Sequence, residues 1–391
     1  GPVIGGFLAD HGTTLILGHV VAGWRWVFYA NAPVSALALF MVLTQTPGLT
    51  RKGSGGKIDF AGAMLIIVAS VPFLLALTWG GRLWPWLSWQ VLGLLALSAA
   101  AVIALLRVEA RVDNPIIPLG LFGDRVFTTA NAGSVIMGAA YMGVVAFMPL
   151  FMQVGQGMEA TRSGLTMLAL MTGITVSSAI NGRLVTMAGV YKPSLVIGAA
   201  ILALGVGSMV FIGPHTSNLD LVWRLFIVGV GLGPTQAMFG LAIQNAVPLD
   251  QVGVATSASQ FFRALGNTVG VAVFGVMLTS NLGLELAHRT PPGQVAAHLE
   301  LGDLQRMAMA QSNAPRPAAG EPGPSPTPLQ AAVRASFSAA VVSGLKVALA
   351  AVIAGFFVIL MIPGRPLREH PEPLRAEAEA EAELESEARL S

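Results

Sequence analysis

Long apolar stretches dominate the pattern of residues along the chain. A helix that crosses the roughly 30 Å of hydrocarbon in a bilayer needs about 20 apolar residues. Stretches of that length without a charged residue are 27–46, 60–79, 87–106, 127–153, 163–182, 194–212 and 225–245. Two more, 254–279 and 337–361, carry one cation each, Arg263 and Lys346. The pattern predicts nine full spans, and residues 1–8 look like the end of another.

These spans are expected to be helices. Every backbone amide in hydrocarbon must be paired within the protein, so only helices and closed barrels cross a membrane. The stretches show no strand-like alternation. We therefore predict an all-α polytopic membrane protein with nine full transmembrane helices and a partial one. Segment 12–23 is too short to cross and is predicted to be a loop insertion or a dipping segment.

Lys and Arg are concentrated in alternate loops, which predicts the orientation. Short cytoplasmic loops carry an excess of these cations. The richer loops contain Arg51, Lys52, Lys57, Arg107, Arg111, Arg125, Arg183 and Lys192. The other loops contain Arg25, Arg82 and Arg162, with Arg224 at a helix edge. The first set is predicted to be cytoplasmic, which puts residues 1–8 at the outer face and the tail after Pro363 in the cytoplasm.

Two segments are not expected in the membrane. Residues 281–335 include a run rich in Pro, Gly and Ala, which cannot bury a core and predicts a disordered outer loop. Residues 364–391 end in an Ala/Glu run, and we predict an acidic, solvated cytoplasmic tail with no role beyond solubility.

Composition supports lipid as the solvent and narrows the chemistry. Apolar residues make up 54% and charged residues 11%, against about 25% charged in soluble proteins. The net charge of +2 gives no reason to expect a nucleic-acid partner. The chain has no Cys, its His residues lie in predicted loops or tails, and neither HExxH nor GxSxG occurs. We predict no catalytic residue, no metal site and no cofactor, which disfavours an enzyme.

The first residues carry a family resemblance. Gly1, Pro2, Gly5 and Gly6, in the run GPVIGG, resemble the end of the antiporter motif of drug exporters in the major facilitator superfamily. Proline removes a helix hydrogen bond, and the glycines allow close contact with a neighbouring helix. WRWVFYANAP at 24–33 is similar to the start of that family's sixth helix.

Other motifs resemble the fourteen-helix drug:proton antiporter branch. They are TWGGRLWPW at 78–86, NPIIPLGLF at 114–122, and QNAVP, GVATS and FFR between 244 and 263. The resemblance covers most of residues 1–279, and the loop between Gly6 and Trp24 is longer than in the family. A fourteen-helix protein without its first four helices and most of its fifth keeps nine full spans, as the hydropathy pattern predicts.

The resemblance implies a major facilitator fold and a division of the chain. The expected parts are the end of the N-terminal helical half at 1–46, two extra central helices with linkers at 47–125, the C-terminal six-helix half at 126–363, and the tail at 364–391.

It also implies proton-coupled efflux of amphipathic drugs by alternating access, in a bacterial cytoplasmic membrane. The expected partners are the lipid bilayer, a small amphipathic substrate, protons and the N-terminal helices that this chain lacks relative to the family. An exporter of one metabolite, siderophore or self-made antibiotic, and a non-transporting fragment, remain as alternatives.

Proton coupling needs a carboxylate inside the membrane. Asp59 and Glu109 are predicted at cytoplasmic helix ends, and Asp10, Glu159 and Asp220 at outer ends. In the family the key acids belong to the N-terminal helices. We therefore expect the coupling machinery to be incomplete in this chain.

Polar, aromatic and Met residues within the spans are candidates for a substrate cavity. They are Asn131, Tyr141, Phe147, Met171, Gln236, Phe239 and Gln244. The alternative is that they join helices by hydrogen bonding and packing.

A cytoplasmic gate is expected from Gly182, Arg183, Gly189 and Lys192, which resemble a second copy of the family's gating motif, together with Arg263. The alternative for the loop cations is ordinary positive-inside charge. Arg263 either extends to the interface or pairs with a lost acid or a backbone carbonyl as part of a gate, and Lys346 is expected to extend to the outer interface.

Overall fold

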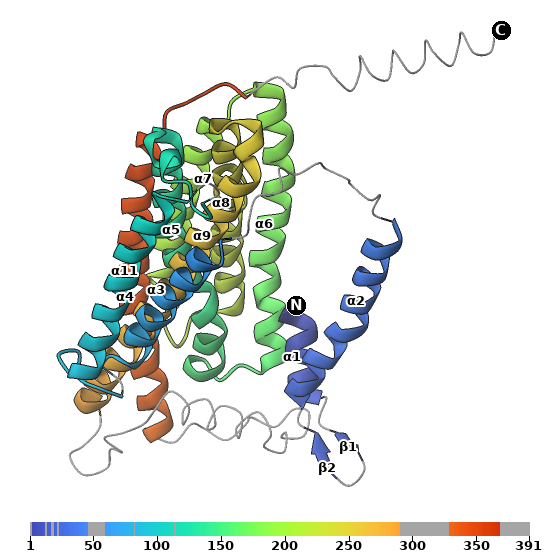
Figure 1. Cartoon of the computed structure of the whole chain (residues 1–391). Coiled ribbons are helices and arrows are strands. Elements are labelled where there is room, and N and C mark those ends of the chain that lie inside the picture. The colour runs from blue at the N-terminus through green and yellow to red at the C-terminus, as the bar shows by residue number, and fades with distance from the viewer. Residues whose placement is uncertain are drawn as a thin grey trace, which may run out of the picture.

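The computed structural model describes residues 2–11, 14–16, 19–21, 23–45, 59–81, 83–112, 115–289 and 328–367 (Figure 1). Nine helices in this part of the chain are long and apolar enough to cross a membrane, which confirms the predicted spans. The elements are α1 (Pro2–His11), β1 (Thr14–Ile16), β2 (His19–Val21), α2 (Gly23–Gln45), α3 (Phe60–Trp79), α4 (Trp89–Glu109), η1 (Leu119–Gly123), α5 (Arg125–Leu150), η2 (Phe151–Gly155), α6 (Ala160–Ala188), α7 (Lys192–Met209), α8 (Asn218–Ala246), η3 (Leu249–Gln251), α9 (Val252–Arg289) and α11 (Pro328–Met361).

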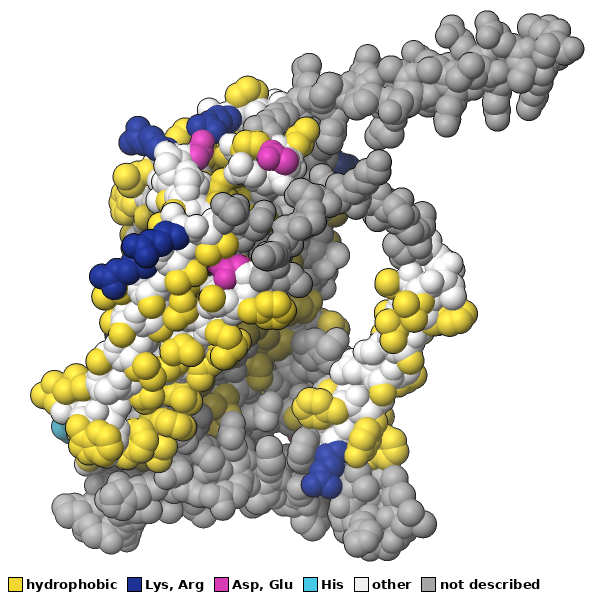
Figure 2. Space-filling view, in the orientation of Figure 1, with side chains coloured by type: hydrophobic (Ala, Val, Ile, Leu, Met, Phe, Trp, Pro, Cys, Tyr) yellow, Lys and Arg dark blue, Asp and Glu magenta, His cyan; other side chains and the backbone are white. Residues whose placement is uncertain are grey.

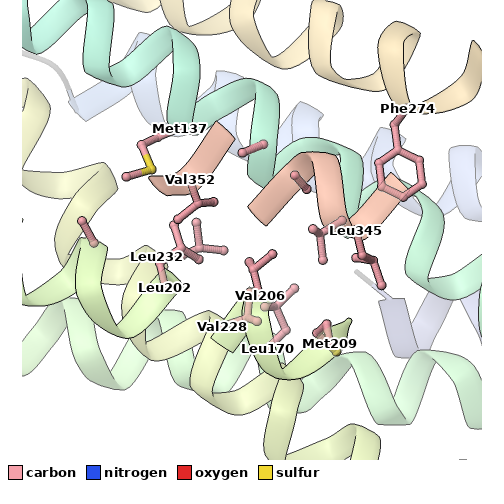
Figure 3. Close-up of a cluster of buried hydrophobic side chains, with 14 of the residues drawn as sticks. Met137, Leu170, Leu202, Val206, Met209, Val228, Leu232, Phe274, Leu345 and Val352 are labelled. Atoms are coloured by element: carbon pink, nitrogen blue, oxygen red, sulfur yellow. The ribbon is translucent and has the colours of Figure 1, made fainter. Parts of the chain in front are cut away.

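Helices α5 to α9 and α11 form a packed six-helix unit. Within it α8 contacts α5, α6, α7 and α9, while α11 contacts α5, α7 and α9. The interior is filled by buried aliphatic and aromatic side chains from all six helices (Figure 3). Leu170, Leu202, Val228 and Leu345 are among those with no exposed surface. The expected division of the chain, with a C-terminal half at 126–363, stays a prediction.

Helices α3 and α4 form an antiparallel pair on one side of this unit, where α3 contacts α9. The Ser98 hydroxyl of α4 donates to the Ala69 carbonyl of α3 at 2.6 Å. A buried hydroxyl needs such a partner, so this bond fixes how the two helices pack.

Helices α1 and α2 lie on the other side of the six-helix unit (Figure 1). Helix α1 contacts α6, and α2 contacts α1. The most apolar window of α2 is 0% buried, and Phe28, Phe40 and Leu43 are exposed. Such a surface is suited to lipid or to further helices rather than to water.

The visible surface shows how charge is distributed. In Figure 2 apolar side chains cover most of the described surface, and Lys and Arg side chains gather mainly toward the upper end, with another patch low on α2. An apolar belt with cations toward one end fits a helical membrane protein.

Two local expectations differ from the structure. Part of segment 12–23, predicted as a loop or a dipping segment, forms an antiparallel strand pair in which Leu15 pairs with Val20. The predicted outer loop 281–335 is shorter, because α9 continues to Arg289 and α11 begins at Pro328. A helix need not end where hydrocarbon ends, and Arg289 pairs with Glu285 at 3.0 Å, one turn apart in the last turns of α9. Residues 290–327 and the tail from 368 lie outside the described part.

Candidate functional site

Polar side chains from α8 and α9 meet around one cation. The Arg263 Nη1 atom donates to Gln236 Oε1 at 3.4 Å, and its Nη2 atom donates to Gln260 Oε1. Tyr141 of α5 and Phe239 of α8 line the same narrow space. We call Tyr141, Gln236, Phe239, Gln244, Gln260 and Arg263 the Arg263 cluster.

Helical spacing explains why these residues face one another. On α8, Phe239 follows Gln236 by three residues and Gln244 follows Gln236 by two steps of four. On α9, Gln260 follows Thr256 by four residues and Arg263 follows Gln260 by three, so each set lies near one face of its helix. The two faces meet, and Gln244 Nε2 lies 3.4 Å from Thr256 Oγ1. The cluster is therefore built by two stripes of polar residues on α8 and α9.

The space around Arg263 is almost closed. The cavity next to Tyr141, Gln236 and Phe239 has a volume of about 10 Å³, which is about what one water needs. The neighbouring cavity next to Gln244 and Gln260 has about 90 Å³. In this state the cluster can hold water or a small polar group, and a drug-sized ligand would require the helices to move.

The structure gives Arg263 two side-chain amides as partners, while its expected roles at the interface or opposite a lost acid stay predictions. The guanidinium does not pair with an acid or a backbone carbonyl among the described residues; it donates to two side-chain amides. Amide oxygens satisfy its donors without neutralising its charge. A positive charge therefore remains available at the cluster.

Three predicted cavity residues lie elsewhere. Asn131 is buried and donates to the Phe127 carbonyl at 2.9 Å. Phe147 stacks on Phe274 with ring centroids 4.8 Å apart. Met171 packs against the apolar core. Their contacts match the alternative of structural packing, while Tyr141, Gln236, Phe239 and Gln244 do come together.

Sequence reasoning did not select Ser134, Thr256 and Ser259, which line the cavity beside Gln244. The available signal was spacing, because Thr256, Ser259 and Gln260 precede Arg263 by seven, four and three residues.

The predicted gate residues fall into two places. Arg263 belongs to its cluster, whereas Gly182 and Arg183 lie in the last turns of α6, Gly189 follows that helix and Lys192 begins α7. Arg183 is exposed and makes no ion pair within the described ranges. Gly189 caps α6 with a φ of 66°, a conformation that favours glycine. Lys192 donates to the Leu360 carbonyl of α11 at 3.2 Å.

The segment after α11 makes several contacts with the α6–α7 turn and the start of α5. The Leu367 amide donates to the Gly189 carbonyl at 2.8 Å, and Arg365 pairs with Asp124 at 2.9 Å. The Tyr191 hydroxyl donates to the Pro363 carbonyl at 3.1 Å. Burial raises the pKa of Tyr191 above its usual range, so the phenol keeps its proton at neutral pH. These contacts join the start of α5 and the α6–α7 turn to the end of α11.

The glycine motif in α1 makes one close contact. A Cβ added at Gly6 would lie 2.6 Å from the Ala160 carbonyl oxygen at the start of α6, whereas one at Gly5 would meet nothing within 4 Å. Pro2 is the first residue of α1, and Gly1 lies outside the described part. The close helix contact expected from the motif is therefore at Gly6 alone.

We predict that Gly6→Leu releases α1 and α2 from α6, while Gly5→Leu does not. The leucine would strike backbone atoms of α6, which cannot rotate away as a side chain can. The chain has no native Cys, so spin labels can be placed at Phe40→Cys and Leu204→Cys. The distance distribution between them should broaden for Gly6→Leu and stay as in the parent for Gly5→Leu. Equal distributions in both variants would contradict the assigned contact.

Comparison with known proteins places this arrangement in a family. Residues 1–271 match the Major Facilitator Superfamily. The chain is 34% identical over 294 residues to the multidrug transporter protein MdtP of Bacillus subtilis, covering 75% of this chain and 52% of that protein. It is 30% identical over 281 residues to multidrug resistance protein 3 of the same organism, covering 72% and 52%.

A fungal relative is also similar. The aspyridones efflux protein of Neocamarosporium betae is 29% identical over 312 residues, covering 77% of this chain and 54% of that protein. The chain thus spans about half the length of the curated relatives it matches. With its apolar helices, packed six-helix unit and family match, the chain is a multi-pass membrane protein that belongs to the Major Facilitator Superfamily.

Proposed function

We propose that this chain supplies the C-terminal part of a proton-coupled exporter of amphipathic small molecules. In such a carrier one helical half rocks against the other around a central site. The names of the relatives support an efflux role, since two are multidrug proteins and one is an efflux protein. The fourteen-helix branch, the N-terminal helices as partners, and coupling to protons are parts of this proposal.

The Arg263 cluster is the observation that carries the proposal. It combines aromatic faces, amides and a permanent charge on helices α5, α8 and α9. Aromatic rings accept varied apolar shapes, and amides can both donate and accept hydrogen bonds. Because the cavities beside it are small, access to a drug-sized molecule would come from a change between two helix arrangements.

The same cluster gives weight to a second candidate, the export of one particular metabolite. A guanidinium without a carboxylate partner in the described residues suits a substrate that carries an acidic group. It equally suits an acid on the N-terminal helices of the complete carrier. Competition by anionic and cationic compounds in one transport assay separates these possibilities.

The orientation follows from the loop charges and can be tested with single cysteines. Leu87 in the α3–α4 turn is 85% exposed, and Met187 near the end of α6 is 84% exposed. In intact cells we expect a membrane-impermeant maleimide to label Leu87→Cys but not Met187→Cys, which should react after permeabilisation. The opposite labelling would reverse the topology and place the tail after Pro363 outside.

We propose that transport requires helices in addition to those described here. We would compare this chain alone with a fusion in which the part of the 34%-identical relative that this chain does not match precedes it. The fusion is expected to export ethidium in a way that a protonophore abolishes, and the chain alone is expected to insert without exporting. Export by the chain alone, or a well-inserted fusion without export, would contradict the proposal.

Substitution of Phe239 tests whether the cluster is the central site. Phe239→Ala in the fusion is expected to lower ethidium export several-fold, because an aromatic face of the cluster is lost. Phe357→Ala on α11 removes the same group from a position that is 61% exposed and should leave export unchanged. Equal export by all three proteins would place the substrate elsewhere.

A further inference from the structure

A large cavity lies outside the Arg263 cluster. It has a volume of about 500 Å³, lies between α3, α4, the linker before α5, and α9, and is partly open to the outside. Sites for drug-sized ligands have volumes of roughly 300–1,000 Å³. Its walls are apolar except for Ser70, Ser98 and Glu109, and the Ser98 hydroxyl is already bonded to Ala69.

Glu109 is the one ionisable side chain among the lining residues, and it is 4% exposed. Its Oε2 atom accepts from the Ile117 amide at 3.3 Å, whereas its Oε1 atom is buried without a hydrogen-bond partner. A buried carboxylate oxygen in apolar surroundings is costly unless it is protonated or paired. The Oε1 atom of Glu109 therefore lacks the partner that would offset the cost of its burial.

A second carboxylate, that of Asp59, adds another oxygen without a partner close to Glu109. Asp59 caps α3 by accepting from the Gly62 amide at 2.8 Å through Oδ1, and its Oδ2 atom is buried and unpartnered. A Cβ added at Gly62 would strike Asp59 Oδ2 and lie 3.2 Å from Glu109 Oε1, so both free oxygens crowd one side of Gly62. Neither acid forms an ion pair in the described ranges. Two such oxygens favour a cation beside them.

Aromatic rings add to the preference for a cation. Phe73, Phe122, Phe261 and Phe262 line the cavity. Phe262 meets Phe122 and Phe261 edge to face, at centroid distances of 5.9 and 5.5 Å. The faces of such rings attract organic cations. An apolar cavity with aromatic walls and one unpaired carboxylate fits a ligand that is hydrophobic and positively charged.

We propose that the cavity between α3, α4 and α9 binds a lipophilic organic monocation, whose charge pairs with Glu109. This site is separate from the Arg263 cluster, because Tyr141, Gln236 and Phe239 do not line it. The proposal does not depend on export, since a chain that binds but does not transport would still show it.

Binding of tetraphenylphosphonium to the full chain in lipid nanodiscs tests the proposal. Equilibrium dialysis, corrected for empty nanodiscs, should show saturable binding that Glu109→Gln weakens at least about tenfold. Glu285→Gln is the matched control, because Glu285 is a carboxylate on α9 that already pairs with Arg289 at 3.0 Å, and its affinity should equal that of the parent. Tetraphenylborate has the same shape and the opposite charge, so it should not compete.

The location of the bound cation is tested with a single cysteine. Ser70→Cys lines the cavity, and Leu204→Cys lies on α7 at a position that is 72% exposed. Tetraphenylphosphonium should slow alkylation of Ser70→Cys by N-ethylmaleimide and leave Leu204→Cys unaffected. The protection should disappear when Glu109→Gln is added.

A cavity-filling variant provides a second test in case Glu109→Gln does not fold. Ala99→Phe fills the cavity from α4 without removing charge, and it should also weaken binding at least about tenfold. Parent-like affinity of Ala99→Phe or of folded Glu109→Gln would overturn the proposal. So would competition by tetraphenylborate, which would show an apolar site open to lipid chains, or saturable binding that leaves Ser70→Cys unprotected.

Discussion

Gly229→Leu is expected to prevent the six-helix unit from forming a stable protein. A Cβ at Gly229 on α8 would strike the Leu170 carbonyl oxygen of α6 and lie 3.0 Å from the Ile174 amide nitrogen. The contact is reciprocal, because a Cβ at Gly173 on α6 would lie 2.5 Å from the Phe226 carbonyl oxygen. In membranes, small residues let helices approach to this distance.

We expect Gly229→Leu to cost a large part of the protein's stability, because the atoms that the new side chain would strike all belong to the backbone. Overpacking costs roughly 1–3 kcal/mol where side chains can shift, whereas here two helices must separate. We expect Gly229→Leu to lose the monodisperse peak after detergent extraction, or to unfold at least about 10 °C below the parent.

Gly240→Leu is the matched control on the same helix, since a Cβ at Gly240 would meet nothing within 4 Å. It should extract and unfold as the parent does. Parent-like behaviour of Gly229→Leu would mean that α6 and α8 do not pack through these glycines.

The spanning helices could be predicted from sequence because a single length governs them. The thickness of hydrocarbon requires about 20 apolar residues, and the predicted span 60–79 coincides with α3, Phe60–Trp79. That rule says nothing about structure beyond the bilayer. It therefore could not anticipate the three-residue strands near Leu15 and Val20, or the continuation of α9 to Arg289.

The candidate site was harder to predict, because a few polar residues on a mainly apolar helix do not show which of them face a cavity. Gln236 and Phe239 were expected in a substrate cavity and line the small space beside Arg263, and their contact with a substrate stays a prediction. Asn131 and Phe147 have the same chemistry, but Asn131 is bonded to the Phe127 carbonyl and Phe147 is stacked on Phe274. Only the rotation of each helix in the bundle separates the two outcomes.

The burial of Glu109 was equally hard to predict from the sequence. Its position at the end of α4 was predicted. Its burial was not, because it depends on the linker after α4, which brings the Ile117 amide to the carboxylate. Charge patterning along the chain cannot show that a distant backbone amide will cover an acid.

Arg263→Leu in the fusion is expected to reduce protonophore-sensitive ethidium export at least about tenfold. A guanidinium stays charged in proteins, and charged groups within spans are costly unless they serve a function or are paired. Arg263 bonds to Gln236 and Gln260 at once, so it holds α8 and α9 together beside Tyr141 and Phe239. Leucine would leave both amides without this donor and would remove the only charge of the cluster.

Two variants separate charge from packing. Arg263→Lys keeps the positive charge but lacks the planar fork that reaches two acceptors, so it should retain part of the export. Lys346→Leu removes one of the two cations of α11, at an exposed position, and should export as the parent does. Thermal unfolding of each variant distinguishes a lost site from a lost fold. A folded Arg263→Leu protein with parent-like export would show that the guanidinium only joins two helices, and the central site would then have to be sought among other residues.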